Sequence, residues 1–237
     1  SADQGEGPAA LSGPTERASF DRAFSRSFFG DARGAVARLY RELGDIHGAG
    51  FTTPNGSPLQ HLFFDDLESA RFIQRARTRP LLRSRKKLEQ FRLRIARVRE
   101  EISLDPLTLA ELAYAADASL LAVDRTLAGL AYLQWCGDRN ALNARARHHL
   151  AVRLEELTDA QRSLGRSLRK LWCQRSHISE FAYTRTRLDQ AVRSMRAAAK
   201  RLRNDRPAPA LTGSALDTRG ALEAVLQTTP PKTGRRS

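Results

Sequence analysis

The sequence is poor in the residues that build disulfide scaffolds and β-sheets. Two cysteines and one methionine occur in 237 residues, and aromatic residues make up 7% of the chain. Two cysteines are too few for a disulfide framework, and they lack the spacing of a zinc site. Almost no segment has the pattern of a β-strand, and no stretch resembles a signal peptide or a membrane span. These absences leave helices as the expected structure.

Familiar catalytic motifs are also missing. The sequence contains no phosphate-binding loop, nucleophile elbow or dinucleotide fingerprint. The histidines are His47, His61, His148, His149 and His177. No two of them have the i, i+4 spacing of a helical metal site. Asp65, Asp66 and Glu68 form a carboxylate cluster, but we expect them at a helix start, where they favour the helix dipole. We therefore predict no catalytic residue, no metal ligand and no cofactor.

The sequence does contain long apolar repeats with helical spacing. The clearest repeat places leucines at positions 150, 154, 157, 164, 168 and 171, with Gln161 at the skipped position. Such a seam needs a partner helix to cover it, and neighbouring segments carry matching seams. We therefore predict an all-α fold, an antiparallel bundle of long helices preceded by a short helical hairpin, with no β-sheet.

Glycine and proline divide the chain into four parts. Residues 1–14 are expected to be a connector, 15–57 a helical hairpin and loop, 58–203 the long-helix bundle, and 204–237 a mostly disordered tail. The tail has at most a brief helix near Ala221. Within the bundle, Pro80 should break or kink a helical stretch over residues 59–102. Because residue 1 is serine, we expect a processed product or a piece of a larger protein.

The formal charge of +14 is concentrated in one segment. Between Arg71 and Arg99 there are twelve basic residues and a single acidic one, Glu89. Five of the basic residues fall off the apolar seam and form a candidate contact for an anionic partner: Arg83, Lys86, Lys87, Arg94 and Arg97. No helix-turn-helix, finger or sheet-based nucleic-acid motif accompanies them. A solvated face or a protein contact is therefore favoured over nucleic acid, which would be bound without sequence preference.

Several short segments resemble a known family in their order and spacing. They are FDRAF at 20–24, FGD at 29–31, LGDIH at 43–47, PNGSPL at 54–59, LEEL at 154–157 and the pair LW at 171–172. Together they resemble the helical region that follows the catalytic barrel in bacterial family 20 glycoside hydrolases, the β-N-acetylhexosaminidase type. The turn after Trp172, QRSH at 174–177, departs from the Arg-Asn-Arg-Pro-like turn of that family.

The resemblance implies a non-catalytic role for this chain. The family's barrel carries an adjacent Asp-Glu pair, and this sequence contains no Asp-Glu dipeptide and no run of strands. The expected function is a structural or oligomerisation domain beside a catalytic barrel, inactive alone, in a bacterial cytoplasmic protein. The expected partners are that barrel or a second copy of the chain. No membrane contact is expected. The alternative is a basic helical module that binds nucleic acid or an acidic partner.

Overall fold

The computed structural model describes residues 13–46, 48–53, 56–102, 104–208 and 220–227. These residues form an all-α fold without a β-sheet, as predicted. The α-helices are α1 (Pro14–Phe29), α2 (Ala35–Asp45), α3 (Pro58–Phe64), α4 (Thr78–Glu101), α5 (Pro106–Gly137), α6 (Ala144–Arg175), α7 (Phe181–Arg203) and α8 (Ala221–Gln227). Short 3-10 helices cover Ile73–Arg75, Arg139–Ala141 and Ile178–Glu180.

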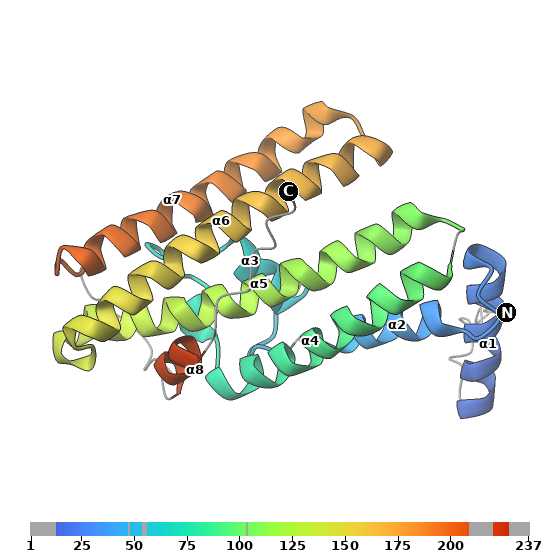
Figure 1. Cartoon of the computed structure of the whole chain (residues 1–237), viewed down its shortest axis with the longest axis horizontal. Coiled ribbons are helices and arrows are strands. Elements are labelled where there is room, and N and C mark those ends of the chain that lie inside the picture. The colour runs from blue at the N-terminus through green and yellow to red at the C-terminus, as the bar shows by residue number, and fades with distance from the viewer. Residues whose placement is uncertain (1–12, 47, 54–55, 103, 209–219, 228–237) are drawn as a thin grey trace, which may run out of the picture.

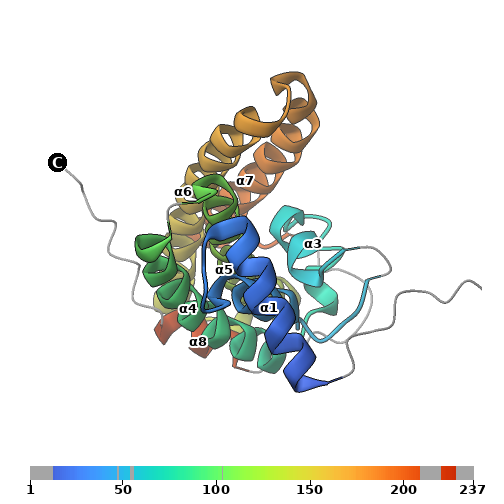
Figure 2. The ribbon, with the colours of Figure 1, turned by 90° about the vertical axis from the view of Figure 1, so that its right-hand side faces the viewer.

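The four long helices form two antiparallel pairs that share one end. Helices α4 and α5 pack together, as do α6 and α7, and α5 also packs on α6. The two pairs diverge from the end where α5 leads into α6 (Figure 1). Helix α1 lies at the opposite end of the α4–α5 pair, and α2 runs from there along α4 (Figure 1, Figure 2). The far half of the α6–α7 hairpin therefore projects away from the rest of the molecule.

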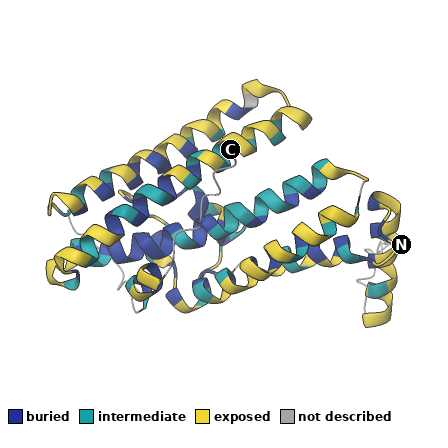
Figure 3. Cartoon of the chain, in the orientation of Figure 1, coloured by how far each residue is buried: buried dark blue, intermediate teal, exposed yellow. Residues whose placement is uncertain are grey.

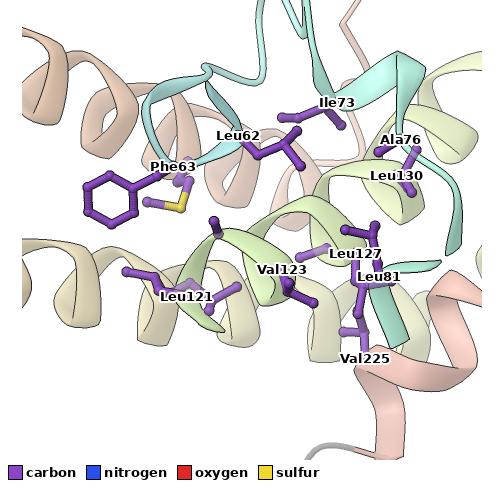
Figure 4. Close-up of a cluster of buried hydrophobic side chains, with 14 of the residues drawn as sticks. Leu62, Phe63, Ile73, Ala76, Leu81, Leu121, Val123, Leu127, Leu130 and Val225 are labelled. Atoms are coloured by element: carbon purple, nitrogen blue, oxygen red, sulfur yellow. The ribbon is translucent and has the colours of Figure 1, made fainter. Parts of the chain in front are cut away.

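Helix α5 is the central element of the core. Proline at the first position and an Asp105 side chain that accepts a hydrogen bond from the Thr108 N–H define its start. Its C-terminal half is buried on nearly every side, by α3, α4, α6 and α8. Figure 4 shows Leu121, Val123, Leu127 and Leu130 of this helix among side chains from its neighbours. Burial of this half on nearly every side explains why it is apolar on nearly every side.

By length and composition alone, α5 could also cross a membrane. This corrects the sequence-based statement that no stretch resembles a membrane span. Packing inside the protein also explains the apolar composition, because α3, α4, α6 and α8 all lie against this helix. The helix also places Asp124 and the buried Arg125 at its centre. We therefore interpret α5 as the core helix of a bundle.

Arg125 and Gln161 form a buried polar cluster that ties α3 to α5 and α6. The Arg125 guanidinium is 1% exposed and donates to the backbone oxygens of Phe63 and of Asp65, the latter at 2.6 Å. It also donates to Gln161 Oε1 at 3.3 Å, and Gln161 Nε2 lies 3.4 Å from the Phe63 oxygen. These carbonyls end α3 and have no partner within the helix. Burial lowers the pKa of Arg125 to about 10.

The segment between α3 and α4 differs from the expected helix with a break at Pro80. Helix α3 ends at Phe64, and a loop follows before α4 begins at Thr78, so Pro80 lies in the first turn, where proline fits. Asp65 follows a helix instead of starting one, and its Oδ2 accepts the N–H groups of Phe72 and Ile73, both at 2.8 Å. Asp65, expected at a helix start, therefore holds this loop in place.

A glycine on α5 allows the same loop to approach the core. A Cβ at Gly129 would lie 2.8 Å from Leu67 Cδ2 and 3.3 Å from Ile73 Cγ2. Both neighbours are buried, so the Leu67 side chain or the loop that carries it would have to shift to accept a side chain there. Gly129 is therefore required by the packing of the loop, although it lies in the middle of a helix.

The brief helix expected near Ala221 is α8, and it belongs to the core. Ala221, Ala224 and Val225 are buried, and the helix packs on α5 and α6. Figure 1 shows it beside the start of α4. The structure therefore extends the bundle beyond residue 203, into the region expected to be a mostly disordered tail.

The leucine seam of α6 divides into a buried and a half-buried part. Leu157 is 2% exposed, whereas Leu164 and Leu168 are half-buried and the helix has no buried residue after Gln161. We expect Leu157→Ala to lower the free energy of unfolding by about 2–5 kcal/mol, and Leu164→Ala by clearly less, because a smaller cavity forms. Urea unfolding of both variants measures the difference. Equal losses would mean that the distal hairpin is packed as tightly as the bundle.

Gln161 lies in the apolar seam, where a leucine is the natural replacement. If its neighbours were apolar, Gln161→Leu would be tolerated or stabilising. In the structure, however, the Gln161 side chain forms hydrogen bonds with Arg125 and with the Phe63 carbonyl. We therefore expect a loss of about 1–3 kcal/mol, because buried polar groups lose a partner. Thermal melts compare this variant with Leu168→Met, which conserves volume at a half-buried position. A Gln161→Leu protein as stable as the parent would contradict this role.

Candidate interaction surfaces

The predicted basic face lies on the outer side of α4, but one of its five residues already forms an ion pair within the protein. Arg83, Lys86, Lys87 and Arg97 are exposed and have no hydrogen-bond or ion-pair partner in the described part of the chain. Arg94 is half-buried, forms an ion pair with Glu42 of α2, and donates from Nε to Glu42 Oε2 at 3.2 Å. We call the remaining four residues the α4 outer face. It extends over about 21 Å of helix.

Other basic residues of α4 hold the helix to its neighbours. Arg92 Nε lies 2.6 Å from Asp117 Oδ1 of α5, and Arg85 Nε lies 3.2 Å from Asp124 Oδ1. Asp124 also accepts from Arg153 of α6 at 3.0 Å, so one carboxylate joins three helices. Burial raises the pKa of Asp124 despite the two arginines. Much of the positive charge of α4 therefore stabilises the bundle and is not available to a ligand.

A second surface is aromatic and lies on the N-terminal hairpin. Phe20, Phe24 and Phe28 follow one another along α1, with ring centroids 6.0 Å and 5.0 Å apart, and Tyr40 of α2 lies 6.3 Å from Phe24. Phe20 is 52% exposed and Phe28 is 63% exposed. We call these four residues the aromatic face. Adjacent phenylalanines exposed to this degree are uncommon on a surface that contacts only water.

Polar contacts hold the two helices of this hairpin in place. Asp21 is buried and forms an ion pair with Arg41, and Ser25 Oγ accepts the Ala37 N–H at 3.0 Å. Asp31 accepts the N–H groups of Arg33 at 2.9 Å and Val36 at 3.0 Å, and so organises the start of α2. The aromatic face is therefore presented on a fixed scaffold.

A third surface is an apolar cleft between α3, α5 and the projecting hairpin. It has a volume of about 470 Å³, and Phe63, Tyr114, Leu168 and Trp172 contribute to its walls. Burial raises the pKa of Tyr114. Arg187 lies over the Phe64 ring at 4.5 Å. The described residues that line this cleft include no carboxylate.

The other groups singled out in the sequence do not come together. His148 and His149 are exposed on α6, and the described residues contain no group of three metal-binding side chains. Cys136 is half-buried and Cys173 is exposed, so only the first is a packing residue. His47 and residues 54–55 lie outside the described residues. The aromatic face is the surface that sequence patterns missed, because three phenylalanines at i, i+4, i+8 indicate a buried seam as readily as an exposed one.

The two sets of basic residues on α4 should differ in their effect on stability. We expect Arg85→Gln with Arg92→Gln to lower the melting temperature, because Asp117 loses its arginine partner and Asp124 keeps only one of its two. Arg83→Gln with Lys86→Gln removes the same charge from exposed positions and should have little effect. Differential scanning calorimetry at one ionic strength compares the pairs. Equal melting temperatures would show that the ion pairs to α5 do not hold the bundle together.

Comparison with known proteins gives no assignment for these surfaces. The chain matches no family model, no curated protein and no solved structure.

Proposed function

We propose that this chain is a non-catalytic helical domain of a β-N-acetylhexosaminidase-like glycoside hydrolase, and that it packs against the catalytic barrel of that protein through the aromatic face. The supporting observation is the exposure of Phe20 and Phe28, at 52% and 63%, beside Tyr40. Aromatic side chains provide a large contact area with little loss of conformational entropy, and they are enriched where proteins meet.

The position of this face supports the same partner. Segments 20–24 and 29–31, which carry much of the resemblance, form α1 and the turn into α2. In the family that they resemble, this region directly follows the barrel, so a barrel would be tethered beside this hairpin. Asp21, Ser25 and Asp31 fix the hairpin, and a surface fixed before binding loses less entropy on association.

The chemistry of the cleft supports a role without catalysis. Glycoside hydrolysis uses two carboxylates separated by about 5–10 Å around the bound sugar. The described lining of the apolar cleft contains Tyr114 and Arg187 as its titratable groups. Neither can act as the acid and base pair that this reaction needs.

A second proposal concerns the α4 outer face. Its four unpaired cations favour contact with nucleic acid or an acidic partner, without sequence preference. The face is formed by one helix, however, and offers a ligand a single row of contacts. We therefore prefer the docking role.

The gene that encodes this chain tests the first proposal. We expect it to encode, upstream of Ser1, a barrel with an Asp-Glu pair at a strand end, and we expect this barrel, expressed separately, to co-elute with the chain. Phe20→Ser with Phe28→Ser should weaken the complex by at least about tenfold, because large aromatic side chains commonly dominate binding energy. Ile178→Ser with Tyr183→Ser, two exposed positions at the tip of the α6–α7 hairpin, is the matched control.

Three results would contradict the proposal. One is an upstream sequence without a barrel. Another is a homodimer of the isolated chain that the phenylalanine substitutions dissociate, which would assign the face to a second copy. The third is hydrolysis of a chromogenic N-acetylglucosaminide by the purified chain above a heat-killed control.

A further inference from the structure

The projecting α6–α7 hairpin carries a groove that neither proposal above uses. Two adjoining hollows of about 720 Å³ and 510 Å³ lie between the helices. They meet where Asp159 of one hollow pairs with Arg162 of the other at 3.5 Å. From Glu155 to Arg169 the groove follows α6 for about 21 Å. It ends at Arg203 near the base of the hairpin and at Ile178 near its tip.

The groove has more positive charge than its own carboxylates can neutralise. Seven arginine and lysine side chains and three carboxylates line it. Each carboxylate pairs with one arginine: Asp159 with Arg162 at 3.5 Å, Asp189 with Arg185 at 3.7 Å, and Glu155 with Arg203 at 2.6 Å. The other four cations have no partner among the described residues and are exposed: Arg166, Arg169, Arg196 and Lys200.

These four cations come from both walls of the groove. Arg162, Arg166 and Arg169 are spaced i, i+4, i+7 on α6, and Arg196, Lys200 and Arg203 have the same spacing on α7. This spacing places each set along one side of its helix, facing the groove. A ligand in the groove is therefore contacted from two sides, whereas the α4 outer face offers one helix.

The groove favours a ligand recognised by charge. Its apolar floor includes Phe181, Leu188 and Val192, which are buried, and its cations stand exposed on both sides of that floor. Three of the four free cations are arginines, whose planar guanidinium donates two parallel hydrogen bonds to a phosphate. Packed helices have axes about 8–10 Å apart, so the two rows of cations are close enough to contact one extended chain from both sides.

We propose that this groove binds the phosphate backbone of a single-stranded nucleic acid. Phosphates lie between α6 and α7 and are contacted by Arg166 and Arg169 on one wall and by Arg196 and Lys200 on the other. No exposed aromatic ring lines the described part of the groove for base stacking, so binding is indifferent to base sequence.

Fluorescence anisotropy with a labelled twelve-nucleotide oligo-dT and a mixed-sequence RNA of equal length tests this proposal. Four phosphate contacts correspond to a salt slope of about 2.8, so affinity should fall about 50-fold between 50 and 200 mM KCl. A variant with Arg166→Gln, Arg169→Gln, Arg196→Gln and Lys200→Gln should lose this salt dependence and bind at least about tenfold more weakly at 50 mM. Both oligonucleotides should bind the parent chain alike.

A matched control separates the groove from the overall charge. A variant with Arg83→Gln, Lys86→Gln, Lys87→Gln and Arg97→Gln removes an equal number of charges from the α4 outer face. It should change affinity by less than about threefold, through long-range attraction alone. All eight positions are exposed, and circular dichroism melts check that both variants fold.

Four outcomes would overturn the assignment. Equal losses in the two variants would mean that net charge, and not the groove, holds the strand. Loss only in the control would move the site to α4. A polyglutamate peptide that competes as well as oligo-dT would make the ligand an acidic peptide, and no binding at 50 mM KCl would leave the groove without this ligand. None of these outcomes depends on whether a barrel docks on the aromatic face.

Discussion

The fold depends on covering the apolar surface of α5. The C-terminal half of this helix is buried on nearly every side, and α3, α4, α6 and α8 each cover part of it. Two adjacent residues near its centre form polar contacts with different neighbouring helices. Asp124 joins Arg85 of α4 and Arg153 of α6, whereas Arg125 reaches the carbonyls at the end of α3. One turn of α5 therefore fixes the positions of three neighbouring helices.

The sequence predicted the elements that local signals define. The seam of α6 is such a local pattern, and the structure confirms the helix that it predicts. The starts of α3 and α5 are local patterns too, each a capping side chain followed by proline. The all-α class followed from the absence of strand patterns. The loop after Phe64 could not be predicted in the same way, because Asp65 is as compatible with a helix start as with bonds to N–H groups seven and eight residues later. The role of α8 depends on burial by distant helices, which a short segment does not encode.

Polar residues on apolar faces were the hardest to interpret. Gln161 at a seam position and Arg125 within an apolar run are each ambiguous until the other is seen beside it. The basic face of α4 was ambiguous for the same reason. The helical repeat distinguishes solvent-facing from core-facing positions, but it does not reveal that Glu42 of α2 pairs with Arg94. Which cations remain free, and which aromatic residues stay exposed, are properties of the assembled helices.

The projection of the α6–α7 hairpin has a consequence for how stability is distributed. Its far half has few buried side chains, as the predominantly exposed surface in Figure 3 shows, so it can open at a lower free energy than the bundle. The groove runs from the tightly packed base of the hairpin into this less stable part. A ligand that contacts both helices there binds only their closed arrangement, and by mass action it would raise the free energy needed to open the tip. The amide hydrogens of the hairpin would then exchange more slowly when a ligand occupies the groove.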